Sequence, residues 1–145
     1  MTTVAEILRS KSSAQIYSVA PSDTILSALR LMADKGIGAL LVMEDGQIAG
    51  IFTERDYARK VVLLGRSSGD TPVREVMTRA VRFVRSTQST DHCMALMTEN
   101  RLRHLPVVDD GEVVGLVSIG DLVKNIISHQ QFLIEQMEQY ITGAR

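Results

Sequence analysis

A short polar pattern occurs twice in the sequence, each time directly after an apolar run. The first copy reads Gly-Ile-Phe-Thr-Glu-Arg-Asp (residues 50–56) and the second reads Gly-Leu-Val-Ser-Ile-Gly-Asp (residues 115–121). The carboxylate that ends each copy, Asp56 or Asp121, stands where a strand is expected to turn into a helix. A short carboxylate at such a corner can accept two hydrogen bonds from a ribose diol, and the helix N-terminus beside it favours a phosphate.

The same pattern also has a purely structural interpretation. Thr53 and Ser118 are each followed three positions later by an acidic residue, which is close to a capping box at a helix N-terminus. Such a cap contributes about 1 kcal/mol to stability and requires no ligand. The pattern by itself leaves capping and ligand binding both open.

This pattern is part of a longer internal repeat. With an offset of 65 residues, residues 19–61 align with residues 84–126 without a gap. Glycines, Asp-Gly pairs and apolar positions all coincide, for example Gly50 with Gly115 and Leu40 with Leu105. Chance seldom matches all of these together, so we interpret most of the chain as one unit written twice.

Each copy predicts a β-α-β-β-α unit. A short strand, an amphipathic helix and two β-rich runs joined by Asp-Gly follow one another, and a second helix begins at Thr53 or Ser118. The strands are expected near residues 16–19, 39–43 and 48–52, and again near residues 81–84, 104–108 and 113–117. We therefore expect an α/β (α+β) fold with pseudo-twofold symmetry between the copies.

The segments around the copies define the expected domains. Thr71-Pro72 predicts the start of a short helix that ends at Met77, and residues 4–8 predict a matching lead-in helix. Residues 128–141 predict an additional amphipathic helix, whose apolar face docks on its own domain or on a partner. The expected divisions are residues 1–66 (first repeat with its lead-in helix), 67–127 (second repeat) and 128–145 (C-terminal amphipathic helix).

Composition and charge narrow the classes of function. A net charge of -1, an aromatic content of 4% and the absence of tryptophan argue against nucleic-acid binding. No apolar run of about 18 residues could span a membrane, and we expect no secretory signal. The single cysteine, Cys93, fits a reducing, cytoplasmic location. Because no nucleophile–base pair or metal-ligand spacing stands out, we expect neither enzyme activity nor a metal site.

The ordered set of motifs resembles the cystathionine-β-synthase (CBS) domain, and the chain resembles a stand-alone tandem CBS pair. In the second copy the resemblance rests on Leu-Arg-His-Leu-Pro-Val-Val-Asp (residues 102–109), on Asp-Gly at 110–111 and on residues 115–121. In the first copy it rests on Ile-Gly-Ala-Leu-Leu-Val (residues 37–42), on Asp-Gly at 45–46 and on residues 50–56. It covers roughly residues 4–127 and implies adenosine-containing ligands in clefts between the copies.

The resemblance also implies roles for particular residues. Asp56 and Asp121 would hold the ribose, with Thr53 and Ser118 beside the ribose or the phosphate. Adenine would rest against the residues that lead into the second strand of each copy, which are Ile37, Gly38 and Ala39 in one cleft and Leu102, Arg103, His104 and Pro106 in the other. Apart from the resemblance, Tyr17 at the edge of the first strand and Arg82 are further candidates for contact with the ligand. A solvated strand face is the structural alternative for Arg82.

The two copies differ in charge at this point. The second copy has Arg-Leu-Arg-His at residues 101–104, where the first has Gly-Ile-Gly-Ala at residues 36–39. Arginine presents fixed donors to a phosphate. We therefore hypothesise that Arg103 and His104 hold the phosphate of a nucleotide whose ribose lies on Asp56, with Arg55 and Arg59 assisting. A solvated turn is the structural alternative for Arg103, and the two sites are predicted to be unequal.

By resemblance, the function is that of a regulatory sensor. AMP, ADP or ATP is the expected ligand, NAD is a further candidate, and the output would pass to a separate effector protein. The apolar helix faces of a small pair also predict a homodimer. The alternative is a structural interaction module that binds no ligand.

Overall fold

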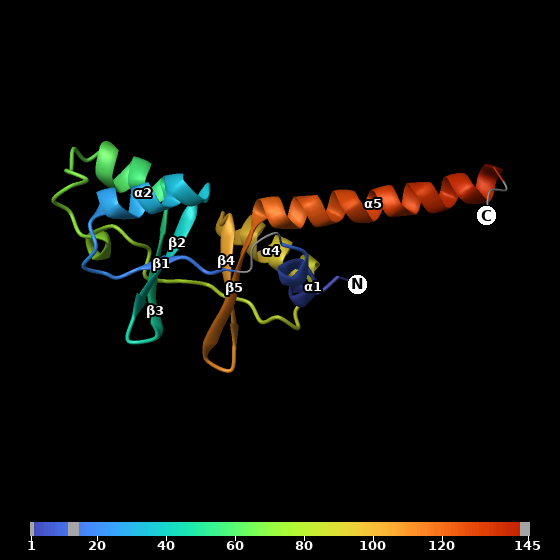
Figure 1. The fold of residues 1–145 in the computed structure, drawn as a ribbon, viewed down its shortest axis with the longest axis horizontal. Helices are drawn as coiled ribbons and strands as arrows, with labels where there is room; N and C mark the ends of the chain where they lie inside the picture. Colours follow the sequence, from blue (N-terminus) through green and yellow to red (C-terminus); the bar gives the residue numbers. More distant parts are fainter. Residues whose placement is uncertain (1, 12–14, 143–145) are drawn as a thin grey trace. The chain divides into compact units, whose positions relative to one another are not determined.

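The computed structural model describes residues 2–11 and 15–142, and the chain divides into two compact units. One unit spans residues 15–82, and the other combines the N-terminal segment up to residue 14 with the chain from Phe83 onward. Figure 1 labels the elements of both. The division differs from the sequence repeats, because the lead-in segment of each repeat packs in the other unit.

A three-stranded sheet forms the centre of the unit of residues 15–82. Strand β1 (Ser18–Val19) pairs in parallel with β2 (Ala39–Glu44), which pairs antiparallel with β3 (Gln47–Thr53). Asp45 and Gly46 both have positive φ, as a two-residue type I′ turn requires, so the predicted Asp-Gly hairpin is confirmed. Helix α2 (Ile25–Lys35) contributes Ile25, Ala28 and Met32 to the core beside the sheet.

The chain after β3 forms short and irregular helices. Helix α3 (Glu54–Asp56) continues into the π-helix η1 (Tyr57–Val62), and a single 3₁₀ turn, η2 (Val73–Glu75), follows. The expected helix of residues 71–77 is therefore wrong in length. It stops because Thr78 forms a bridge with Ile51 of β3, which draws the backbone after Met77 into an extended path.

The second unit is built on one hairpin and three helices. Strands β4 (His104–Asp109) and β5 (Glu112–Ser118) pair antiparallel, beside α1 (Val4–Ser10) and α4 (Thr90–Asn100). The strand expected near residues 81–84 is not formed. Val84 makes a single parallel bridge to Val107, while the amide of Val81 bonds locally to the carbonyl of Arg79 instead of extending a ladder.

The lead-in segments are exchanged between the repeats. Val4 and Ile7 of α1 lie in the core with residues of the second repeat, and Val73 and Val76 lie in the core of the first. The two aligned glycines permit this packing. A Cβ atom on Gly115 would lie 2.6 Å from Cδ2 of Leu8, and one on Gly50 would lie 2.8 Å from the sulfur of Met77.

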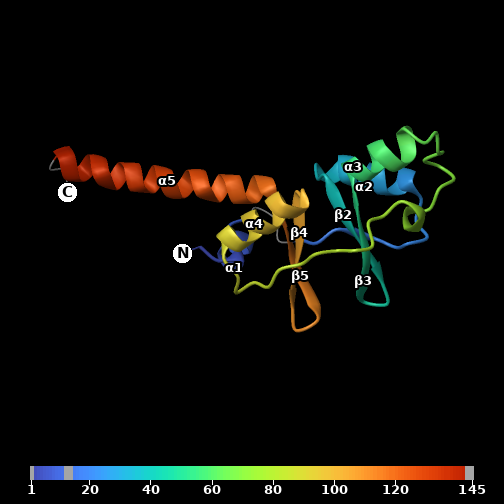
Figure 2. The same cartoon turned by 180° about the vertical axis from the view of Figure 1, so that it is seen from behind.

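Helix α5 (Ile119–Thr142) is continuous over 24 residues. The expected separate helix of residues 128–141 is wrong in its start, because no glycine or proline interrupts the chain between Asp121 and Thr142. Of this helix, Leu122 alone is buried, and the helix runs well beyond α1 and α4 of its own unit (Figures 1 and 2). Among the described residues no helix has the length and apolar character needed to cross a membrane.

Candidate functional site

The first Thr/Ser-x-x-Asp corner lies where β3 passes into α3. Thr53 has an extended backbone and caps α3, its hydroxyl accepting a hydrogen bond of 3.2 Å from the amide of Asp56. In return the amide of Thr53 donates to Oδ2 of Asp56 at 3.0 Å. The capping-box interpretation is therefore confirmed at this corner.

The other oxygen of Asp56 is also engaged by the protein. Oδ1 accepts a hydrogen bond of 3.0 Å from the hydroxyl of Thr78 and an ion pair of 3.0 Å from Nζ of Lys60. Lys60 is fixed in turn by the carbonyl of Val76, at 3.0 Å. Asp56 is only 6% exposed. Both carboxylate oxygens thus serve the internal structure of the unit.

The second corner, between β5 and α5, leaves its carboxylate more open. Ser118 and Asp121 exchange the same pair of bonds, with 2.9 Å from the Ser118 amide to Oδ2 and 3.1 Å from the Asp121 amide to the Ser118 hydroxyl. Nζ of Lys11 lies 3.0 Å from Oδ2 and donates to the carbonyl of Leu116 at 2.8 Å. Oδ1 accepts no hydrogen bond from any residue that the structure describes, and the side chain is 22% exposed.

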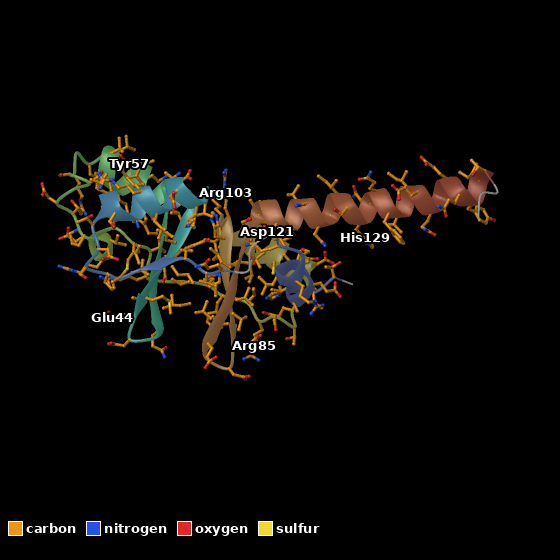
Figure 3. The ribbon with its side chains drawn as sticks, in the orientation of Figure 1. Glu44, Tyr57, Arg85, Arg103, Asp121 and His129 are labelled. Atoms are coloured by element: carbon orange, nitrogen blue, oxygen red, sulfur yellow. The ribbon has the colours of Figure 1, made fainter. Side chains whose placement is uncertain are left out.

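The Asp121 carboxyl is held in its charged form. Burial by itself raises its pKa, but hydrogen bonds from the Ser118 backbone and from Lys11 outweigh burial and lower the pKa below its ordinary value. Figure 3 marks Asp121 in the first turn of α5. A carboxylate that is ionised, partly exposed and without a donor at one oxygen among the described residues can accept hydrogen bonds from a hydroxylated ligand.

His104 and Arg103 lie beside this second corner. His104 faces Ser118 across the β4–β5 hairpin, and the carbonyl of Arg103 accepts a 2.8 Å hydrogen bond from the amide of Ile119. Burial lowers the pKa of His104, the charge of Asp121 opposes this shift, and the charges of Lys11 and Arg103 add to it. The imidazole is therefore neutral at pH 7, whereas the Arg103 side chain is exposed and charged (Figure 3).

The first unit has the same hydrogen bond and strand pairing, with Gly38 and Ala39 in place of Arg103 and His104. The carbonyl of Gly38 accepts a 3.1 Å hydrogen bond from the amide of Glu54, and Ala39 pairs with Thr53 across the hairpin. Four of the residues predicted to touch adenine, Gly38, Ala39, Arg103 and His104, therefore lie directly beside the predicted ribose corner of the same repeat.

Of the remaining predicted site residues, Arg55 lies within the first corner, and the others lie further from the corners or inside the units. Ile37, Leu102 and Tyr17 pack half-buried against the two cores, and the Tyr17 ring has Nζ of Lys35 at 5.4 Å from its centroid. Pro106 is buried within β4. Arg55 and Arg82 are exposed.

Three residues of the corners were not identified from the sequence. Lys60 could have been found, because it stands four positions after Asp56 on a helix, where opposite charges meet. Lys11 and Thr78 are distant in sequence from the carboxylates they contact, and no local pattern marks them. No group of three or more His, Cys, Asp or Glu side chains that could hold a metal lies within residues 2–11 and 15–142.

Comparison with known proteins agrees with this architecture. The model of the CBS domain matches residues 4–63 and 73–128. The chain belongs to the CBS-domain family. This CBS pair is 37% identical over 150 residues to the mitochondrial CBS domain-containing protein CBSX3 of Arabidopsis thaliana, a match covering 98% of this chain and 73% of the relative.

Solved structures of this family have the same fold. A CBS-domain protein assigned to signal transduction, from Burkholderia ambifaria MC40-6, is 61% identical with a TM-score of 0.86, covering 89% of this chain and 96% of that one. The CBS pair of protein MJ0100, in complex with 5′-methylthioadenosine and S-adenosyl-L-methionine, is 26% identical with a TM-score of 0.79, covering 89% and 98%. The expected tandem CBS pair and its mixed α/β fold are thus confirmed.

Proposed function

We propose that this CBS pair is a regulatory sensor of adenosine-containing ligands, with the Ser118–Asp121 corner as its principal ribose site. The carboxylate of Asp121 carries the proposal, because it is ionised and partly exposed, and because Oδ1 accepts no hydrogen bond from the described residues. The two hydroxyl groups of a ribose supply donors for it. The adenosyl ligands of the MJ0100 pair support this class of ligand.

Two neighbours would add to recognition at this corner. Arg103 offers an exposed guanidinium for a phosphate of AMP, ADP, ATP or NAD. His104, neutral at pH 7, would contribute a hydrogen bond rather than a charge. The hypothesis that Arg103 and His104 serve a nucleotide whose ribose lies on Asp56 stays a prediction, since these residues belong to different compact units.

The Asp56 corner favours a second, structural role. A ribose there would have to replace Thr78 or Lys60, whose bonds to Oδ1 are both 3.0 Å. We therefore expect Asp56 to bind a ribose more weakly than Asp121, and to act chiefly as an internal support. This difference agrees in direction with the predicted inequality of the two sites.

Isothermal titration with AMP, 5′-methylthioadenosine and S-adenosylmethionine tests the proposal, with Asp121→Asn and Asp56→Asn as matched variants. Loss of a charge-assisted hydrogen bond should weaken binding by Asp121→Asn about tenfold to a hundredfold, while Asp56→Asn should weaken it less. Arg103→Ala should weaken AMP binding but leave the uncharged 5′-methylthioadenosine unaffected. Unchanged affinity in Asp121→Asn would refute the ribose role.

If none of these ligands binds at millimolar concentration, the result would favour the alternative of an interaction module that binds no ligand. In either case we expect no enzyme activity and a separate effector protein that receives the signal. A homodimer and a cytoplasmic location also stay predictions, and the Arabidopsis relative is mitochondrial by name.

A further inference from the structure

The exposed side of α5 carries a regular apolar seam. Its members are spaced alternately four and three residues apart, as in the a and d positions of a coiled coil. They are Val123, Ile127, Gln130, Ile134, Met137 and Ile141. The five apolar members are 43–75% exposed, so the rest of the unit leaves this seam uncovered along the whole helix.

The positions on either side of the seam differ in chemistry. One flank is apolar and consists of Ile126, Leu133 and Tyr140, of which Leu133 and Tyr140 are 49% and 85% exposed. The other flank is polar and consists of Lys124, Gln131 and Glu138. Each flank repeats every seven residues, so an apolar flank and a polar flank run along the two sides of the seam of α5.

We propose that the seam of α5 pairs with the same seam of a second copy, in antiparallel orientation. Ile134 then packs against Gln130, Met137 against Ile127, and Ile141 against Val123 of the other copy. An antiparallel pair brings like flanks together.

On the polar side, Lys124 meets Glu138 of the other copy, twice by symmetry. On the apolar side, Leu133 meets its own equivalent near the twofold axis.

A parallel pair does not fit these residues equally well. It would bring the apolar flank of one helix against the polar flank of the other, so that Leu133 would meet Glu138. A second copy is favoured over an unrelated protein because a single helix carries both members of the charge pair at the spacing that twofold symmetry needs. This inference does not depend on whether the corners bind adenosine.

Site-directed cross-linking tests the pairing directly. In a Cys93→Ala background, which copies the Ala28 of the first repeat, Gln131→Cys places a thiol near the twofold axis. A short bis-maleimide should then link two chains into a species of twice 16.0 kDa. Ile141→Cys is the control, because in the antiparallel pair its two copies lie about 27 Å apart along the helices. Linkage of Ile141→Cys but not of Gln131→Cys would indicate a parallel pair and overturn the proposal.

Charge reversal supplies an independent measurement. Glu138→Lys would set two lysines against each other at both ends of the pair and raise the dimer Kd about tenfold in sedimentation equilibrium. Adding Lys124→Glu should restore the original Kd. A double variant as weak as the single one, or a wild-type chain that sediments at 16.0 kDa, would also overturn the proposal.

Discussion

Replacing Asp56 by alanine would remove a buried acceptor on which several donors depend. The lost half of the capping box, in which the Thr53 amide donates to Oδ2, costs about 1 kcal/mol. The hydroxyl of Thr78, 3.0 Å from Oδ1, would lose a hydrogen bond to a charged group, which costs about 1.5 kcal/mol. The Lys60 side chain is 41% exposed, so its ion pair adds less than about 1 kcal/mol. We therefore expect Asp56→Ala to lower the free energy of unfolding by about 3 kcal/mol.

The aligned carboxylate provides the comparison for this experiment. Asp121→Ala removes the same half of a capping box and the ion pair of Lys11, whose side chain is 28% exposed, but no bond equivalent to that of Thr78. Its expected loss is about 1.5 kcal/mol. Urea unfolding followed by circular dichroism measures both values, and Thr78→Val isolates the hydroxyl with an expected loss of about 1.5 kcal/mol. Equal losses for the two aspartates would show that the extra bonds of Asp56 contribute nothing.

Two further predictions follow from the same contacts. Because the pKa of His104 is lowered in the folded state, its contribution to stability is complete above its unfolded pKa of about 6.5 and declines as the pH falls through the folded pKa. Thermal unfolding between pH 7 and 5 should show this loss of stability. His104→Phe should remove the part of the pH dependence that His104 contributes. Gly50→Ala should destabilise by roughly 2 kcal/mol or more, because its Cβ would lie 2.8 Å from the backbone carbonyl of Thr78. Gly115→Ala should cost less and be rescued by Leu8→Ala, since only the Leu8 side chain stands in its way; equal, unrescued losses in thermal unfolding would contradict this reasoning.

The local features of this fold could be predicted from the sequence. Both hairpins follow from Asp-Gly between β-rich runs, and both corners follow from a hydroxyl residue three positions before an aspartate, because the forces involved act within a few residues. The expected strand before Val84 failed because its partner strand offers it only one bridge. The expected break before Ser128 failed because a change from buried to exposed surroundings leaves the helical backbone unaltered.

The candidate site was predictable only in part, for a similar reason. Asp121 and Asp56 look alike in sequence, yet their contacts come from distant positions. Lys11, 110 positions away, forms an ion pair with Asp121, and Thr78, 22 positions away, donates a hydrogen bond to Oδ1 of Asp56. These contacts depend on which lead-in segment packs against the strands of each unit. The exchange of the two lead-in segments involves close packing at Gly50 and Gly115, which no local pattern reveals.

That exchange has a consequence for how the chain is made on the ribosome. The unit of residues 15–82 is contiguous and can fold as soon as it emerges. Helix α1 is synthesised first, but Lys11 reaches its acceptor on Leu116 only after 105 further residues, which takes about 5–20 s at ordinary rates of synthesis. The other residues of the core that Val4 and Ile7 join run from Val84 to Leu122, so that core is incomplete throughout that interval. A polar substitution at Ile7 should therefore impair the unit that is completed last, although it lies at the beginning of the chain.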